Sequence, residues 1–210
     1  MLKKIYLDWK DEIFTYRRQL SLALFLALIA IILNMLSGNY VDKVGTAQPA
    51  DLILDALPPI DLSILYAIIF FPAVIFIIVR PFVSRIQKIH YVIGVLSVFL
   101  VIRAGFAVLT HLMVPIDAVH PSWIPAFYDP FSFSNYLFFA GNVGVLFLGF
   151  LMYESKPVKY YLLTASILTA IIVLFMHTHY SIDVLAAYFI TYGIYKFGDF
   201  IFGEEKDGKK

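Results

Sequence analysis

Long runs of apolar residues, separated by short polar segments, dominate this chain. Six of these runs each approach the roughly 20 residues that a helix needs to cross a hydrocarbon core. They lie near residues 20–37, 62–79, 91–114, 136–153, 160–177 and 181–201. The core of a bilayer offers the backbone no water, so spans of this length are expected to be helices. The pattern predicts an all-α polytopic membrane protein with six transmembrane helices.

The composition agrees with that pattern. Of the 210 residues, 61% are hydrophobic and 15% are charged, and the mean hydropathy of +0.83 is far above that of soluble proteins. The chain has no cysteine, which excludes disulfides and thiolate metal sites. We therefore expect an integral membrane protein with a single transmembrane domain over residues 20–202.

Charged segments flank the predicted domain on both sides. Residues 1–19 carry a mixture of charges with one apolar helical face, and we expect an interfacial helix there. Residues 203–210 form a short charged tail. No small-residue cleavage site follows the first span, so that span is expected to remain in the mature protein. The apolar face of the leading segment consists of Ile5, Trp9 and Ile13.

The 16 Lys and Arg residues are distributed unevenly along the chain. The N-terminal segment, the loops at 80–90 and 154–159 and the C-terminal end hold all of them except Lys43 and Arg103. By the positive-inside rule, both termini and these two loops are cytoplasmic, and the other three loops face outward.

Residues 176–189, MHTHYSIDVLAAYF, place His179 and Asp183 four residues apart at the start of the sixth run. On a helix this spacing puts both side chains on one face, about one turn apart. A carboxylate there orients an imidazole and stabilises its charged form. Ionisable residues at the edge of a span are costly and indicate a functional site. The alternative is a plain helix cap, with Ser181 as the N-cap and Asp183 in the first turn.

Three segments share a wider pattern. The segment HTHYSIDVLAAYFITYGIY, which starts at His177, follows His-x-His-Tyr-[Thr/Ser]-[Ile/Val]-Asp-Val. Two more segments are RAGFAVLTHLMVP, from Arg103 to Pro115, and NYLFFAGNVG, from Asn135 to Gly144. Together they resemble the sphingomyelin synthase family, a branch of the type 2 phosphatidic acid phosphatase superfamily, over residues from about 60 to 200.

The resemblance implies a phosphatidic-acid-phosphatase-like helical core and transfer of a phosphoryl group from a lipid headgroup through a phosphohistidine. It assigns His179 as the nucleophile and Asp183 as its orienting carboxylate, without a metal or other cofactor. The neutral imidazole attacks phosphorus, the carboxylate supports the developing cation, and an acid opposite lets the alcohol depart. Tyr180 and Gly141 belong to the shared motifs and join the predicted substrate site. The implied partner is a membrane lipid, with no nucleic acid.

The chain departs from the family where that acid is expected, because Ala140, Gly141 and Asn142 replace Ser-Gly-His. Asn142 donates hydrogen bonds but cannot deliver a proton, and the loss of an acid costs roughly 10²–10⁴ in rate. The departure favours a weakened enzyme, an enzyme with a substitute acid, or a catalytically silent relative that binds lipid or a membrane partner. Three histidines on the outward side are candidates for a substitute or helper group: His111, His120 and His177.

Arg103 lies near the middle of the third predicted span. A guanidinium at that depth needs a carboxylate, a set of carbonyls or an aqueous cavity. Asp183 and a lipid phosphate are both possible partners, so a structural ion pair and a ligand-binding role stay open. A site with so little cationic charge suits a zwitterionic headgroup better than a doubly anionic phosphate.

Two other classes of function compete with lipid chemistry. Imidazole and carboxylate groups are common ligands of zinc and manganese, and a transporter would show inverted repeats or broken helices, which the sequence lacks. We expect a lipid phosphatase or headgroup phosphotransferase at the outer face of the plasma membrane, with Arg103 and Asn142 contacting phosphate. The metal alternative would draw on His111, His120, His177, His179 and Asp183.

Overall fold

A computed structural model describes residues 7, 9–10, 13–84, 89–119, 135 and 137–203 of the chain. Helices dominate this part, and no strand occurs among the described residues beyond one isolated bridge between Ala47 and Leu112. The elements are α2 (Arg17–Val44), the short 3₁₀ helix η1 (Leu54–Ala56), α3 (Ser63–Ser84), α4 (Ile89–Leu109), α5 (Gly141–Met152), α6 (Lys156–Phe175) and α7 (Ser181–Phe202). The all-helical prediction is confirmed for the described residues.

Four of these helices, α2, α3, α4 and α6, are long and apolar enough to cross a membrane. The helix α7 has 22 residues but is less apolar, because it contains Asp183, Lys196 and Asp199. The helix α5 has only 12 residues, and at 1.5 Å per residue it is about 18 Å long, well short of a hydrocarbon core of about 30 Å. Integration into a membrane therefore rests on four helices.

The short α5 corrects the prediction of a helix over residues 136–153. Phe138 and Phe139 have φ values of 60° and 47°, in the left-handed region that bulky residues rarely adopt. A right-handed helix cannot pass through these two residues, so α5 begins only at Gly141. Phe139 is fully buried against Phe99, with ring centroids 5.4 Å apart. We infer that this aromatic packing offsets the cost of the unusual backbone.

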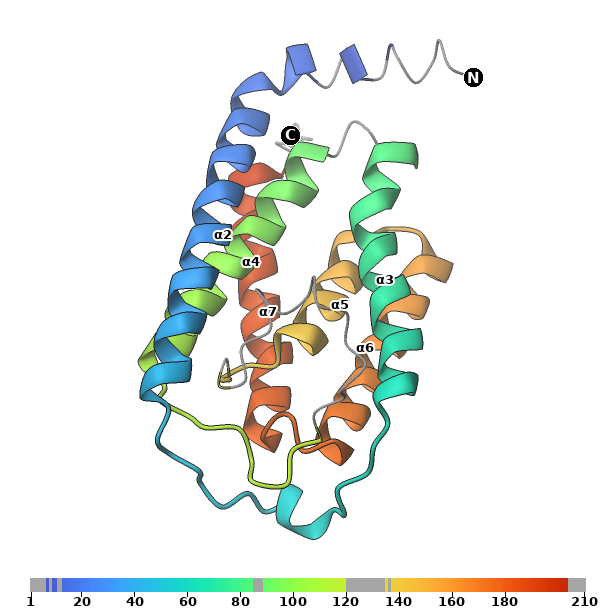
Figure 1. Cartoon of the computed structure of the whole chain (residues 1–210). Coiled ribbons are helices and arrows are strands. Elements are labelled where there is room, and N and C mark those ends of the chain that lie inside the picture. The colour runs from blue at the N-terminus through green and yellow to red at the C-terminus, as the bar shows by residue number, and fades with distance from the viewer. Residues whose placement is uncertain are drawn as a thin grey trace, which may run out of the picture.

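The helices form a bundle in which segments distant in sequence lie side by side (Figure 1). The helix α2 packs along α4, α4 packs against α7, and α7 packs against α5. On the other side of α5 lies α6, and α3 contacts both α6 and α5. Figure 1 shows the short α5 inside the bundle beside α7, and its N-cap Ala140 is bonded to Asp183 in the first turn of α7.

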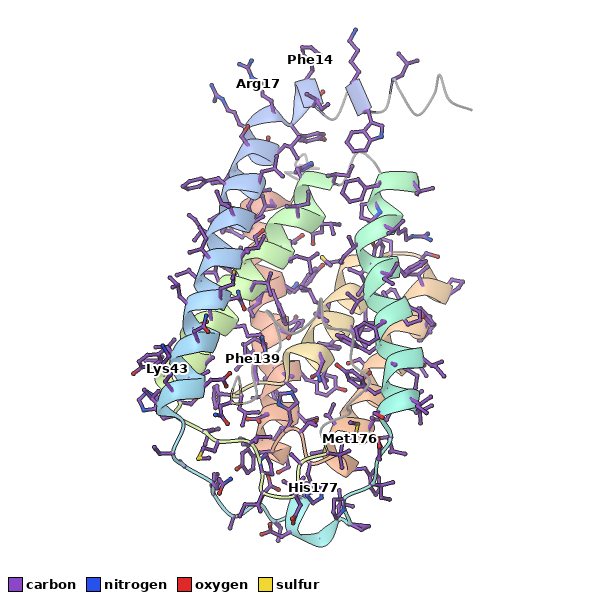
Figure 2. All side chains as sticks on the ribbon, viewed as in Figure 1. Phe14, Arg17, Lys43, Phe139, Met176 and His177 are labelled. Carbon is purple, nitrogen blue, oxygen red and sulfur yellow. The ribbon has the colours of Figure 1, made fainter. Side chains whose placement is uncertain are left out.

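The ends of the helices sort into two groups. One end of the bundle holds the start of α2, the end of α3, the start of α4 and the end of α7 (Figure 1). The end of α2, the η1 segment, the end of α4 and the turn between α6 and α7 lie at the opposite end, which we call the loop end. Figure 2 places Phe14 and Arg17 at the first end and Lys43 and His177 toward the loop end.

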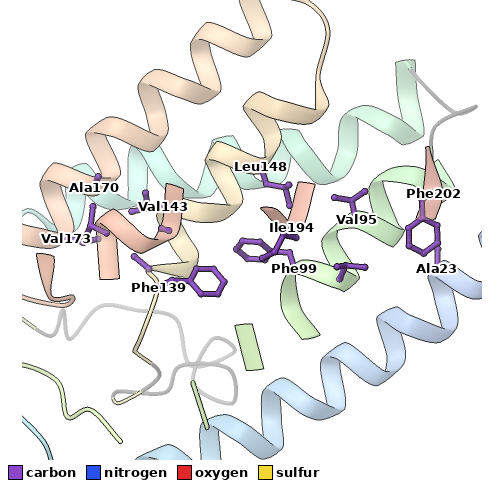
Figure 3. Close-up of a cluster of buried hydrophobic side chains, with 14 residues drawn as sticks. Ala23, Val95, Phe99, Phe139, Val143, Leu148, Ala170, Val173, Ile194 and Phe202 are labelled. Carbon is purple, nitrogen blue, oxygen red and sulfur yellow. The ribbon is translucent and has the colours of Figure 1, made fainter. Parts of the chain in front are cut away.

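The main apolar core runs between α4, α5 and α7 (Figure 3). Phe99, Val143 and Ile194 are among its buried members. Near the end of α7, the ring of Phe202 lies against α4 at Gly94, where an added Cβ atom would be 2.6 Å from the ring. The missing side chain allows the two helices to approach closely, as small residues do in membrane bundles.

The faces of α2 and α3 that point away from the interior of the bundle are apolar and exposed. Such faces are unusual in soluble proteins and are expected where a helix borders lipid. They agree with integration of the bundle into a membrane. Examples on these faces are Leu24, Phe25, Leu28 and Leu36 of α2 and Ile64, Ile68 and Ile75 of α3.

The flanking segments of the predicted domain fall largely outside the described residues. Ile5 of the predicted interfacial face and residues 204–210 of the tail lie outside them. The helix α2 starts at Arg17, so the last residues of the predicted 1–19 segment belong to this helix. The ring of Trp9 contacts that of Phe82 in α3, with centroids 6.0 Å apart.

Candidate functional site

The motif HTHY forms the turn between α6 and α7. The helix α6 ends at Phe175, and His177 has a φ of 53°, in the left-handed region. The backbone N–H of Thr178 donates to the carbonyl of Val173 at 3.1 Å, which closes the end of the helix. The predicted fifth helix, which reached residue 177, is therefore too long. His177 belongs to neither helix, and its Nε2 lies 3.1 Å from the carbonyl oxygen of Leu57.

His179 and Asp183 come together at the start of α7. His179 Nδ1 lies 3.5 Å from Asp183 Oδ2, and both residues are buried. The N-cap is Tyr180 rather than the predicted Ser181, because Tyr180 has an extended backbone and Ser181 is already helical. His179 therefore precedes the helix, and the pairing arises from the cap rather than from one helical face.

The Asp183 carboxylate has two different oxygen environments. Its Oδ2 atom accepts a hydrogen bond of 3.1 Å from the backbone N–H of Tyr180. Its Oδ1 atom and the Nδ1 atom of His179 are buried and have no hydrogen-bond partner among the described residues. The contact between His179 and Asp183 is thus at ion-pair distance, and the carboxylate faces the Nδ1 side of the ring. The other ring nitrogen of His179, Nε2, is therefore the one that does not face Asp183.

The start of α5 lies directly beside this pair. The backbone N–H of Ala140 donates to the carbonyl oxygen of Asp183 at 3.0 Å, which ties the starts of α5 and α7 together. Gly141 lies against the side chain of Arg103 in α4: an added Cβ would be 2.7 Å from Cζ and 2.8 Å from Cδ of the arginine. Glycine is the only residue that permits this approach.

The neighbouring Asn142 faces α3. Its Oδ1 accepts the backbone N–H of Val143 at 2.9 Å, and its Nδ2 lies 3.4 Å from the hydroxyl oxygen of Tyr66. The ring of Tyr66 stacks on Phe70, with centroids 5.0 Å apart. Asn142 stands where the family has its acid histidine, and the hydroxyl of Tyr66 therefore lies close to that position at the start of α5.

The other predicted histidines are placed differently. His111 is exposed and contacts α2, where its Nε2 is 3.2 Å from the hydroxyl of Tyr40. No contact joins its side chain to His179 or Asp183 in the described part of the chain. His120 lies outside the described residues. Within the described ranges, no three His, Asp or Glu side chains gather as a metal site would require.

Asp51 is a further residue of this region that sequence reasoning missed. Its Oδ2 atom accepts a hydrogen bond of 2.6 Å from the backbone N–H of Ser181, at the start of α7. Burial tends to raise the pKa of this carboxyl group, but hydrogen bonds from Leu54, Ser181 and Ile53 outweigh burial and lower the pKa below its usual value. The pattern Asp-x-x-Leu indicates a local cap of η1, whereas the contact with α7 is not visible in the sequence.

The N-cap Tyr180 is held from a second loop. Its hydroxyl donates to the carbonyl oxygen of Met113 at 2.9 Å. Burial raises the pKa of this hydroxyl, and the negative charges of Asp183 and Asp51 raise it further. Both carboxylates therefore act on the same point, the start of α7.

A scan against protein-family models finds no match for this chain, and searches of curated proteins and of solved structures find none either. The resemblance to sphingomyelin synthases therefore depends on the quoted motifs, and the function must be argued from the geometry of the site.

Proposed function

We propose that this protein is a lipid phosphatase or phospholipid headgroup phosphotransferase of the sphingomyelin-synthase-like type. His179 is the nucleophile, Asp183 its supporting carboxylate, and Arg103 the cation that binds the phosphate. The remaining predicted contacts to substrate are assigned to Asn142 and, within the two motifs, to Gly141, Tyr180, His177 and His111.

One observation carries this proposal: Arg103 packs on Gly141 at the start of α5, and the adjacent residue Ala140 is bonded to Asp183. The start of a helix has a partial positive charge and backbone N–H groups that point outward. A guanidinium beside it adds a full positive charge, so both groups favour an anion at the same place. A phosphate ester bound there would lie beside the His179–Asp183 pair.

The arrangement supports a two-step reaction. Nε2 of His179 attacks phosphorus, and the bond from phosphorus to the leaving oxygen breaks. Asp183, on the Nδ1 side, stabilises the imidazolium that forms. Water or an acceptor alcohol then attacks the phosphohistidine and releases a phosphate or a new phosphodiester.

Tyr66 is our candidate for the missing acid. Its hydroxyl lies 3.4 Å from the amide nitrogen of Asn142, at the position of the family histidine. Tyrosine can serve as a general acid. Its proton passes to the leaving oxygen in the first step, and the attacking water or alcohol returns a proton to the phenolate in the second.

The proposal also includes the setting of the site. The six helices α2 to α7 form the membrane core, with α5 reaching only part of the way across. The loop end faces outward from the plasma membrane, and both termini are cytoplasmic. The uneven distribution of Lys and Arg supports this orientation, and the start of α7 lies at the loop end (Figure 1).

The test uses purified protein in lipid nanodiscs with radiolabelled phosphatidic acid and phosphatidylcholine, with and without ceramide as acceptor. We expect release or transfer of the labelled group and an acid-labile phosphoenzyme that His179→Ala abolishes. The control His90→Asn changes a histidine at the opposite end of the bundle, beside Tyr16, and should retain the phosphoenzyme. If wild-type protein shows neither turnover nor phosphoenzyme with any of these lipids, the enzymatic proposal is wrong.

Replacement of the proposed acid gives a second measurement. Tyr66→Phe should lower kcat by about 10²–10⁴, and the loss should be smaller for a lipid whose leaving group needs no proton. Tyr160→Phe, an exposed tyrosine near the start of α6, should have no effect. Full activity in Tyr66→Phe would remove Tyr66 from the mechanism but leave His179 in it.

A catalytically silent relative that binds lipid is the second candidate. It is favoured by Ala140 and by Asn142, which cannot deliver a proton. Restoring the family motif with Ala140→Ser and Asn142→His should create turnover if the natural chain is silent. If the wild-type chain already turns over lipid at a rate that this double variant does not improve, the silent alternative fails.

A further inference from the structure

The geometry points to Asp51 as a positioning residue: its carboxylate anchors the start of α7 and thereby sets His179 against Asp183. The effect expected on catalysis rests on the proposed function, whereas the effect on the geometry of His179 does not.

Asp51 uses both carboxylate oxygens. Oδ1 accepts the backbone N–H groups of Ile53 and Leu54, each at 3.0 Å, which caps η1. Oδ2 accepts the N–H of Ser181 at 2.6 Å, and hydrogen bonds to an ionised carboxylate are shorter and stronger than those between neutral groups. The residue is buried, with 7% of its surface exposed. One carboxylate thus joins the segment after α2 to the start of a helix that follows 130 residues later in the chain.

Ser181, the residue that Asp51 holds, lies midway in the sequence between the two residues of the proposed catalytic pair. Ser181 stands two residues after His179 and two residues before Asp183. The first N–H groups of a helix have no partner within the helix, and Asp51 satisfies one of them. A shift of this N–H would move the cap, and the His179–Asp183 separation depends on that cap.

The segment that carries Asp51 is itself held at both ends. The N–H groups of Thr46 and Ala47 each donate to the carbonyl of His111 at 3.0 Å. At the other end, the N–H of Ile60 donates to the carbonyl of Phe175 at 2.8 Å, where α6 ends. Asp51 therefore reaches α7 from a fixed support, as a positioning residue must.

A matched pair of aspartates makes the inference testable. Asp61 also caps a helix start, since its Oδ1 accepts the N–H of Ser63 at 2.9 Å, and hydrogen bonds from Ser63 lower its pKa. Asp61 serves α3 and has no contact with α7 among the described residues. Asp51→Asn should disturb His179, and Asp61→Asn should not.

The first measurement is independent of activity. Diethyl pyrocarbonate modifies exposed imidazoles, and mass spectrometry of the His179 peptide gives the rate. His179 is buried in the wild type, so we expect slow modification there and in Asp61→Asn, and clearly faster modification with an altered pH profile in Asp51→Asn. The second measurement is kinetic: kcat should fall about tenfold or more in Asp51→Asn with KM little changed, because a small misplacement of a reacting group is costly.

Ser181→Pro provides an independent variant. It removes both the N–H and the hydroxyl through which Ser181 bonds Asp51. The helix is kept, because proline is well tolerated at the first helical position and Tyr180 has the extended backbone that proline requires before it. This variant should affect His179 as Asp51→Asn does, and the double variant should add little.

The outcomes separate the two proposals. Faster modification of His179 with no wild-type turnover supports the role of Asp51 and rejects the proposed activity. Unchanged modification of His179 in both Asp51→Asn and Ser181→Pro overturns the positioning role, whatever the activity. Equal effects of Asp51→Asn and Asp61→Asn, or unfolding of both Asp51→Asn and Ser181→Pro at the assay temperature, reduce Asp51 to a structural residue and also overturn the inference.

Discussion

At Gly141, the start of α5 and the side chain of Arg103 meet with no space for a Cβ atom between them. The contact brings a guanidinium to the positive end of a helix, so that both groups favour a negative charge at this place. Just before it, Phe138 and Phe139 adopt a left-handed backbone. Backbone strain of this kind concentrates at functional sites.

Gly141→Ala tests whether this contact matters. The added methyl group must displace Arg103 from the start of α5, and we expect kcat/KM for the phospholipid substrate to fall about 100-fold. Gly105→Ala is the matched control: this glycine lies two residues after Arg103 in α4, and nothing lies within 4 Å of its added Cβ. The control should keep full activity and gain about 0.5–1 kcal/mol of stability. Equal activity of the two variants would contradict the assigned role of Arg103.

At the scale of the element, the start of α7 is held from several directions. Asp183 bonds the N–H of Tyr180 from within the helix, Asp51 bonds the N–H of Ser181, and Met113 accepts the hydroxyl of Tyr180. Carboxylates at a helix start stabilise it by hydrogen bonds and through the helix dipole. The start of α7 is therefore the best-anchored helix end of the proposed site.

The lowered pKa of Asp51 gives α7 a pH-dependent anchor. Since the pKa in the folded chain lies below the unfolded value of 3.8, the stabilisation is fully present above that value and is lost as the pH falls through the folded pKa. Asp51→Asn should therefore lower stability by about 1 kcal/mol at neutral pH, and the difference from wild type should shrink in strong acid. Melting temperatures in detergent measure this. The control Asp117→Asn, in an exposed turn, should follow the wild-type curve.

At the scale of the whole molecule, the helix ends divide into two sets, and the candidate site lies toward the loop end (Figure 1). The segments 45–62, 110–119 and 176–180 are joined there by backbone hydrogen bonds. Helices with exposed apolar faces, among them α2 and α3, end at these segments. A substrate with lipid tails would meet such a site from the side of the membrane.

The proposed orientation predicts a labelling pattern, and the absence of cysteine from the chain makes single-cysteine variants unambiguous. Leu52→Cys and Ile116→Cys, at positions 91% and 83% exposed near the loop end, should react with a membrane-impermeant maleimide in intact cells. Tyr160→Cys, near the start of α6, should react only after permeabilisation. The reverse pattern would place the site on the cytoplasmic face.

Hydropathy alone located helices at all six apolar runs, because the run of apolar residues itself determines where a backbone must satisfy its hydrogen bonds internally. Their ends were harder to predict. The short α5 depends on two phenylalanines whose backbone is set by packing against α4, and the end of α6 depends on a left-handed His177. Neither residue type favours that conformation on its own.

The sequence by itself determined the membrane class and the helical fold of the described residues, because these follow from composition and from neighbours in the chain. It also indicated that His179 and Asp183 pair, but on one helical face, whereas in the structure His179 precedes α7 and the pair forms at the cap of this helix. The tertiary structure alone decided that Arg103 lies on Gly141, that Tyr66 reaches Asn142 and that Asp51 anchors Ser181. Each of these contacts joins residues far apart in sequence. Their proximity results from how the helices pack, which no local pattern encodes.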